Sequence, residues 1–167
     1  HGVFRMKTLI LMRHAKSDWG DSRLPDSARP LNARGRKAST ALGHWLRAQN
    51  QHPDQILCSS AVRTQETCAR LKLDTAPDLI DSLYLAEADE MLAVLRRASG
   101  DLVLMLAHNP GIAEFAVLLV ANAPDHDRFE DYPTGAALLV QFDIADWSAL
   151  QPGTGSALQF LTPHDLP

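Results

Sequence analysis

Short, uninterrupted apolar runs are the feature that most restricts how this chain can fold. The runs Thr8–Met12 and Leu102–Ala107 contain little or no polar alternation, so each is expected to be a strand buried on both faces. Stretches with apolar residues at helical spacing lie between such runs, as at Ala38, Ala41, Leu42, Trp45 and Leu46. Because strands buried on both faces need cover on both sides, this alternation predicts an α/β fold. We expect a three-layer sandwich with a mostly parallel central sheet and helices on both faces.

The same periodicities predict the remaining elements. We expect helices over about 32–49, 61–71, 88–97 and 110–120, and further strands at Ile56–Cys58, Leu79–Ile80, Ala136–Ile144 and Ser156–Leu161. Residues 15–30 and 122–135 are polar and are predicted to be long loops. A length of 167 residues favours a single domain over residues 6–167, with residues 1–5 expected to be a leader or a cloning remnant.

Charge is distributed unevenly along the chain. The net charge of -4 argues against a nucleic-acid-binding surface. Residues 1–37 nevertheless carry nine basic and three acidic side chains, whereas the other 130 residues carry seven and seventeen. This segregation is expected either from an unevenly charged surface or from an anion site near the N-terminus. No apolar run is long enough for a membrane span, and the two cysteines, Cys58 and Cys68, suit a reducing cytoplasm.

Polar residues follow three of the predicted strands at the point where each strand ends. They are Arg13, His14, Lys16 and Ser17 after the first, Ser59, Ser60 and Arg63 after the second, and His108 and Asn109 after the fourth. Ligands of α/β sheets bind outside the carboxyl ends of the strands, and arginine forks match phosphate oxygens. A histidine among these cations is kept neutral and nucleophilic near pH 7. The residues alone predict a phosphoryl site without choosing between His14 and His108 as nucleophile.

Two rival phosphatase chemistries fit the sequence less well. Cysteine-dependent phosphatases need five residues between cysteine and arginine, whereas only four separate Cys58 from Arg63. Metal-dependent hydrolysis needs a compact cluster of ligands, and no such spacing of His, Asp and Glu is present. We therefore expect no metal.

Three segments resemble motifs of the histidine phosphatase superfamily, which is also called the phosphoglycerate mutase-like superfamily. The segments are Leu11-Met12-Arg13-His14-Ala15-Lys16-Ser17, Ser59-Ser60-Ala61-Val62-Arg63-Thr64-Gln65-Glu66-Thr67 and Ala107-His108-Asn109-Pro110-Gly111. They occur in the same order as in the family, and the combination of all three is specific for it. With Thr134-Gly135-Ala136 and the short chain, they are most similar to the SixA-type phosphohistidine phosphatases.

The resemblance implies a role for each matched residue. It assigns His14 as the phosphate-accepting nucleophile and Arg13, Arg63 and His108 as the rest of the phosphate pocket. Rim or substrate contacts are expected from Lys16, Ser17 and Asn109. Many members of the superfamily also have a carboxylate proton donor, and the nearest candidate here is Glu87. An acidic residue at a helix start is also explained by the helix dipole.

The function implied is a cofactor-independent phosphatase that acts on phosphohistidine of a signalling or phosphotransfer protein through a covalent intermediate on His14. Phosphohistidine expels an imidazole, which needs less acid assistance than an alkoxide. The first alternative is a phosphatase for a small phosphorylated metabolite. The second is a catalytically silent module that binds phosphoproteins, although such a module has no need of a nucleophile.

Overall fold

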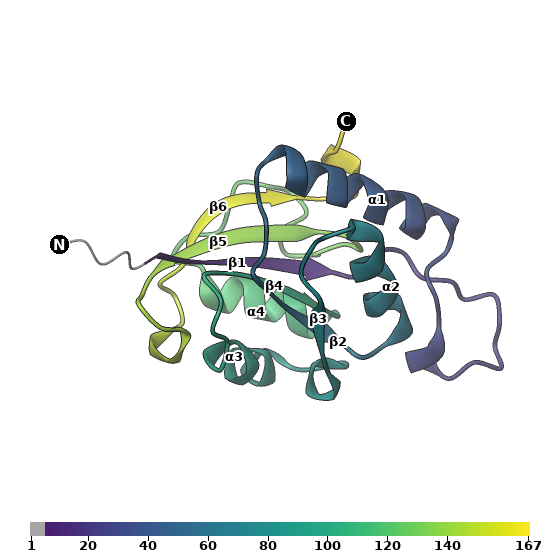
Figure 1. Ribbon diagram of the computed structural model, residues 1–167, viewed down its shortest axis with the longest axis horizontal. Helices are drawn as coiled ribbons and strands as arrows, with labels where there is room; N and C mark the ends of the chain where they lie inside the picture. The colour runs from purple at the N-terminus through teal and green to yellow at the C-terminus, as the bar shows by residue number, and fades with distance from the viewer. Residues whose placement is uncertain (1–5) are drawn as a thin grey trace.

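A single sheet of six strands forms the centre of the structure (Figure 1). The computed structural model describes residues 6–167, so the prediction for residues 1–5 lies outside the described part. The strands are β1 (Met6–Arg13), β2 (Gln55–Ser59), β3 (Pro77–Ile80), β4 (Leu102–Ala107), β5 (Ala137–Asp143) and β6 (Ser156–Leu161). The longer helices are α1 (Ala33–Ala48), α2 (Val62–Leu71), α3 (Ala88–Arg96) and α4 (Gly111–Leu119).

The sheet is mixed, with a parallel half and an antiparallel edge. Its strand order is β3-β2-β4-β1-β5-β6. The pairs β3–β2, β2–β4 and β4–β1 are parallel, whereas β5 runs antiparallel to β1 and β6. The predicted α/β architecture is confirmed, and the carboxyl ends of β1, β2 and β4 meet at one edge.

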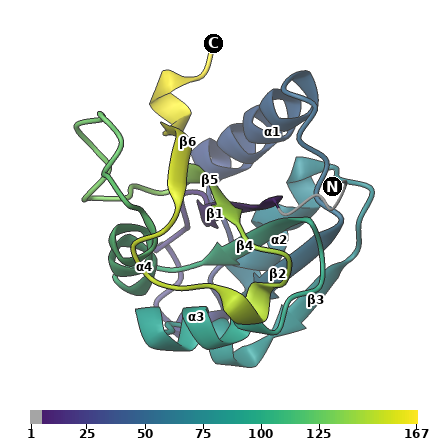
Figure 2. The same cartoon turned by 90° about the vertical axis from the view of Figure 1, so that its left-hand side faces the viewer.

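Alternate residues of each central strand enter different hydrophobic cores. In β1, Leu9 and Leu11 pack on the side of α3 and α4, while Ile10 and Met12 pack on the side of α1 and α2. Figure 2 shows these two helix pairs on opposite sides of the sheet. The period of two along a strand thus divides an uninterrupted apolar run between two cores. None of the helices within residues 6–167 is both long and apolar enough to cross a membrane.

Helix α1 begins where the sequence predicts, but its buried face is shifted. Asn32 accepts a hydrogen bond from the Gly35 amide and caps the helix. The buried face includes Gly35, Gly43 and Ser39, and Trp45 is only half-buried. Small residues therefore allow α1 to approach its neighbours closely, which an apolar stripe alone does not reveal.

Gly35 illustrates this close approach. A Cβ atom at this position would lie 2.0 Å from the main-chain oxygen of Lys16. The first turn of α1 is thereby pressed against the segment that follows β1, and that segment carries His14.

Gly35→Ala should lower the free energy of unfolding by about 1–3 kcal/mol, because the methyl group forces the backbone apart. Thermal and urea denaturation would measure the change. Gly20→Ala is the matched control, since the nearest atom there is the end of the Asp18 side chain at 3.0 Å, which can move. Equal stability of the two variants would contradict the packing argument.

Candidate active site

The register between β1 and β4 places two histidines side by side. Arg13 pairs with Ala107 at the ends of the two parallel strands, so His14 and His108 are the next residues on each. The His14 amide donates to the Ala107 carbonyl at 3.3 Å. The two imidazole rings have centroids 5.2 Å apart and are tilted by 52°. Residues 94 positions apart in the sequence thus share one site.

These histidines lie in a cavity of about 290 Å³ beyond the carboxyl edge of the sheet. It is lined by Arg13, His14, Lys16, Ser17, Trp19, Arg29, Arg63, His108, Asn109 and Thr134. Every residue to which the family resemblance assigns a role is in this set except Glu87, whereas Ser59 and Ser60 at the end of β2 do not line the cavity. Glu87 is exposed and instead forms a capping box with Glu90 at the start of α3.

His14 has a fixed orientation and a defined proton. Its Nδ1 lies 2.7 Å from the Ala15 carbonyl, and because a carbonyl only accepts, Nδ1 carries the proton. The other nitrogen, Nε2, accepts from Arg63 Nε at 3.4 Å. Burial lowers the pKa of His14 to about 3, and the charges of Arg13 and Arg63 act in the same direction. The ring is therefore neutral near pH 7, with a lone pair on Nε2.

His108 is held by a residue from a neighbouring strand. Its Nε2 lies 2.7 Å from Ser59 Oγ at the end of β2. Its pKa is lowered to about 3 by burial and then by the charge of Arg63. Within residues 6–167, His108 Nδ1 and Arg13 Nε are buried without a hydrogen-bond partner. Buried polar atoms are rarely unpaired, so both are candidate contacts for an anion.

Arg63 is oriented by a residue that sequence reasoning missed. Its Nη1 donates to the main-chain oxygen of Asp26 at 2.8 Å, and its Nη2 donates to Asp26 Oδ2 at 3.0 Å. The same carboxylate accepts from the Tyr84 hydroxyl and from Arg29 Nε. The Tyr84 hydrogen bond, together with those from Arg63 and Arg29, lowers the pKa of Asp26 to about 2. Asp26 is thus an ionised anchor for the guanidinium of Arg63.

Ser17 and Asn109 line the cavity, but their side chains already form hydrogen bonds with other residues of the protein. Ser17 Oγ accepts from Arg29 Nη1 at 2.7 Å. Asn109 Nδ2 donates to the main-chain oxygens of Asp131 and Tyr132 at 2.9 and 3.1 Å. Both residues therefore hold the walls of the cavity in place.

The mouth of the cavity also carries an exposed aromatic residue. Trp19 is 76% exposed, and the guanidinium of Arg29 lies 3.5 Å from the centre of its ring. These two residues belong to the loop between β1 and α1, which extends beyond the sheet at the right of Figure 1. Because a loop has no periodic sequence pattern, the positions of these two residues could not be predicted. Only the length of the loop suggested that it has a function.

The loop over residues 122–135 is anchored to the core. Phe129 and Tyr132 are buried, and their rings lie near that of Phe160. The Gly135 amide donates to the His14 carbonyl at 2.9 Å. This segment therefore forms a wall beside His14, packed in place by its own side chains.

Comparison with known families identifies the chain. The family model of the histidine phosphatase superfamily (branch 1) matches residues 9–90, a range that includes Arg13, His14 and Arg63. The chain belongs to the histidine phosphatase superfamily. Its enzymatic activity is that of a phosphatase. No three His, Cys, Asp or Glu side chains within residues 6–167 are grouped to hold a metal ion.

Relatives of this histidine phosphatase span nearly its whole length. An uncharacterized protein of Mycobacterium tuberculosis is 29% identical over 160 residues, which are 92% of this chain and 100% of the relative. The structure of a candidate phosphohistidine phosphatase SixA from Nakamurella multipartitia is 28% identical with a TM-score of 0.84, covering 95% of this chain and 96% of that one. The protein histidine phosphatase SixA complexed with tungstate has the same fold at 20% identity, with a TM-score of 0.76 and coverage of 95% and 98%.

Asp26→Ala should lower kcat/KM of this phosphatase about tenfold on p-nitrophenyl phosphate, because Arg63 loses the acceptor that fixes its orientation. Asp21→Ala is the control, since Asp21 is in the same loop and its carboxylate forms hydrogen bonds within residues 6–167 only with Arg23. Steady-state kinetics at constant ionic strength would measure both. Unchanged kinetics of Asp26→Ala would show that Arg63 needs no anchor.

The two buried histidines should make stability depend on pH. Their folded-state pKa values of about 3 lie below the unfolded value of about 6.5. The unfolded chain therefore binds more protons between these values, and stability should fall as pH decreases from about 6.5 toward 3 by up to ~1.4 kcal/mol per pH unit for each histidine.

Urea denaturation of His14→Asn/His108→Asn between pH 7 and pH 4 should show a flatter profile than the unmodified chain. His52→Asn, at an exposed position, should keep the original slope. A double variant with an unchanged slope would refute the depressed pKa values.

Proposed function

We propose that this phosphatase removes the phosphoryl group from phosphohistidine on a signalling or phosphotransfer protein, through a covalent phosphohistidine on His14. The observation that carries the proposal is the orientation of His14. Its Nδ1 proton is committed to the Ala15 carbonyl, which leaves the Nε2 lone pair beside Arg63 in the cavity. A catalytically silent binding module has no need of such a nucleophile.

In the first step, the Nε2 lone pair of His14 gives up its long hydrogen bond from Arg63 Nε, at 3.4 Å, and attacks phosphorus. A nitrogen–phosphorus bond forms at Nε2 as the bond from phosphorus to the substrate imidazole breaks. In the second step, water attacks the phosphorus of the intermediate, which releases inorganic phosphate and restores neutral His14. Arg13 and Arg63 stabilise the negative charge of the phosphoryl oxygens in both steps.

His108 contributes a further donor in this mechanism. The Ser59 hydroxyl accepts from the Ala61 amide, and its own proton is free to be donated to His108 Nε2 at 2.7 Å. A neutral His108 that accepts at Nε2 carries its proton on Nδ1. This is the buried nitrogen that has no partner within residues 6–167, and in the proposed mechanism it donates to a phosphoryl oxygen.

The choice of phosphohistidine as substrate is supported by the lack of a protonated carboxyl group. None of the ten described residues that line the cavity is Asp or Glu. Asp26, the carboxylate bound to Arg63, has a pKa of about 2 and so holds no proton near pH 7. An alkoxide leaving group needs a proton donor, whereas a phosphohistidine ring already protonated on its other nitrogen departs as neutral imidazole.

An open cavity mouth also favours a protein substrate over a buried metabolite. Trp19 lies exposed at this mouth. Its aromatic ring could pack against the surface of a protein substrate there. Cys58 and Cys68 are free thiols, which is consistent with action in the cytoplasm. The alternative substrate class is a small phosphorylated metabolite.

His14→Ala should abolish turnover, and brief reaction of the unmodified chain with radiolabelled substrate should leave acid-labile label on His14. Mass spectrometry of the trapped peptide would locate it. Glu87→Gln is the control, because Glu87 lies outside the cavity and should retain full activity. Label on His108 would reverse the assignment of the nucleophile.

The substrate class is tested separately. A phosphohistidine protein should have a kcat/KM at least a hundredfold above those of a panel of phosphate monoesters. Exclusive turnover of monoesters would support the metabolite alternative instead.

A further inference from the structure

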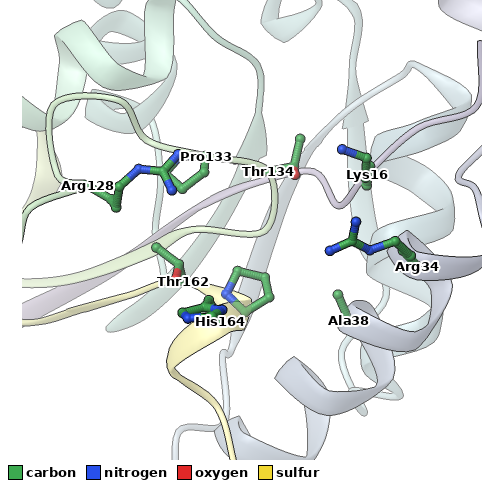
Figure 3. A pocket seen from close by; sticks show the side chains of 9 residues that line it. Lys16, Arg34, Ala38, Arg128, Pro133, Thr134, Thr162 and His164 are labelled. Atoms are coloured by element: carbon green, nitrogen blue, oxygen red, sulfur yellow. The ribbon is translucent and has the colours of Figure 1, made fainter.

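A second cavity adjoins the catalytic one. It has a volume of about 370 Å³ and is lined by Lys16, Arg34, Ala38, Arg128, Pro133, Thr134, Thr162, Pro163 and His164 (Figure 3). Lys16 and Thr134 line both cavities. A molecule whose phosphoryl group is bound beside His14 can therefore extend past these two residues into the second cavity.

The second cavity is cationic. Figure 3 shows Lys16 and Arg34 on one side and Arg128 on the other, with their charged ends directed toward the space between them. None of the nine lining residues is Asp or Glu. Among the salt bridges within residues 6–167, none involves Lys16 or Arg34, whereas Arg128 pairs with Asp131 at 2.9 Å. Two of the three cations thus lack an acidic partner.

The fold holds Arg34 close to Lys16. The Asn32 amide donates to the Lys16 carbonyl at 3.0 Å, and Gly35 lets the first turn of α1 touch the same carbonyl. Arg34 lies between these two contacts in the sequence. Its position relative to the catalytic segment is therefore set by backbone packing and not by a flexible loop.

Acidic residues limit the cationic region on its outer side. A neighbouring hollow shares Arg128, Thr162 and His164 with the second cavity, and it also contains Asp125, Asp127 and Asp165. An anion is repelled there. The most favourable place for a second negative group lies between this hollow and His14.

We propose that the second cavity binds a second anionic group, a carboxylate or a phosphate, on the substrate whose phosphoryl group lies at His14. The inference builds on the proposed function and narrows its substrate class. On a phosphohistidine protein, the ligand would be an acidic side chain near the phosphorylated histidine. On a small substrate, it would be a second phosphate.

Binding to the full chain tests the proposal without requiring turnover. Two peptides would carry a stable phosphonate analogue of phosphohistidine, flanked either by glutamates or by glutamines. A pair of small phosphonates, with and without a second phosphonate group, forms the other arm. Calorimetry would give the Kd of each ligand for the unmodified chain, for Arg34→Gln and for Lys37→Gln, which removes an exposed charge from α1 outside both cavities.

In at least one arm the doubly anionic ligand should bind about tenfold more tightly to the unmodified chain, as expected for a charge-assisted contact. Arg34→Gln should remove most of this preference and leave the singly anionic ligand within twofold, whereas Lys37→Gln should keep the preference. The arm that shows it identifies the source of the second anion. Absence of any preference, equal effects of the two substitutions, or no binding in either arm would overturn the proposal.

These outcomes are separate from those of the proposed function. A preference that depends on Arg34, in a chain that does not hydrolyse phosphohistidine, would overturn the proposed substrate and leave the second site supported. Hydrolysis of phosphohistidine with no such preference would support the proposed substrate and overturn the second site.

Discussion

Parallel pairing between β1 and β4 is the contact on which the site depends. Six consecutive residue pairs align the two strands, from Thr8 opposite Leu102 to Arg13 opposite Ala107. The apolar runs Leu9–Met12 of β1 and Leu102–Ala107 of β4 fill cores on both faces. A slip of one residue would exchange the residues that face each core. The register is thus fixed by hydrophobic packing, and it delivers His14 and His108 to the same edge. Burial of apolar side chains outside the cavity thus determines how the two histidines of the candidate site are placed.

The electrostatics of the cavity follow from that geometry. Arg13, Arg63 and the two histidines are brought to a largely buried edge, where burial disfavours protonation of both imidazoles. Arginine keeps its charge under such conditions, so the site contains cationic donors beside two neutral imidazoles, one of which is the proposed nucleophile His14. Asp26 offsets part of this charge and fixes Arg63 through two hydrogen bonds. Its low pKa keeps that anchor ionised, but it also prevents Asp26 from supplying a proton to a leaving group near pH 7.

Sequence patterns predict the parts of this site that follow periodic elements. Arg13 and His14 end an apolar run, His108 ends another, and the three motifs predict their proximity to Arg63. Asp26 and Trp19 could not be found in this way, because they lie in an aperiodic loop whose path depends on contacts formed only in the folded chain. Glu87 shows the converse, because a sequence pattern can also suggest a residue that does not line the cavity. An acidic residue between two motifs matches a family pattern, yet local helix capping accounts for where it lies.

The contact between α1 and the segment after β1 links the catalytic cavity to the cationic cavity beside it. Gly35 has no side chain, so α1 can press on the Lys16 carbonyl, and this places Arg34 on the same side of the second cavity as Lys16 (Figure 3). Lys16 then lines both cavities. Because Lys16 is exposed and makes no salt bridge within residues 6–167, its ammonium group could interact with the phosphoryl group or with the second anion of the proposed substrate. Under the proposed function, a substrate with two negative groups would use this arrangement fully, since one group would place the phosphorus at His14 Nε2 while the other contacted Arg34. Binding energy from the second group would then orient the reacting one, which is how contacts remote from the chemistry contribute to catalysis.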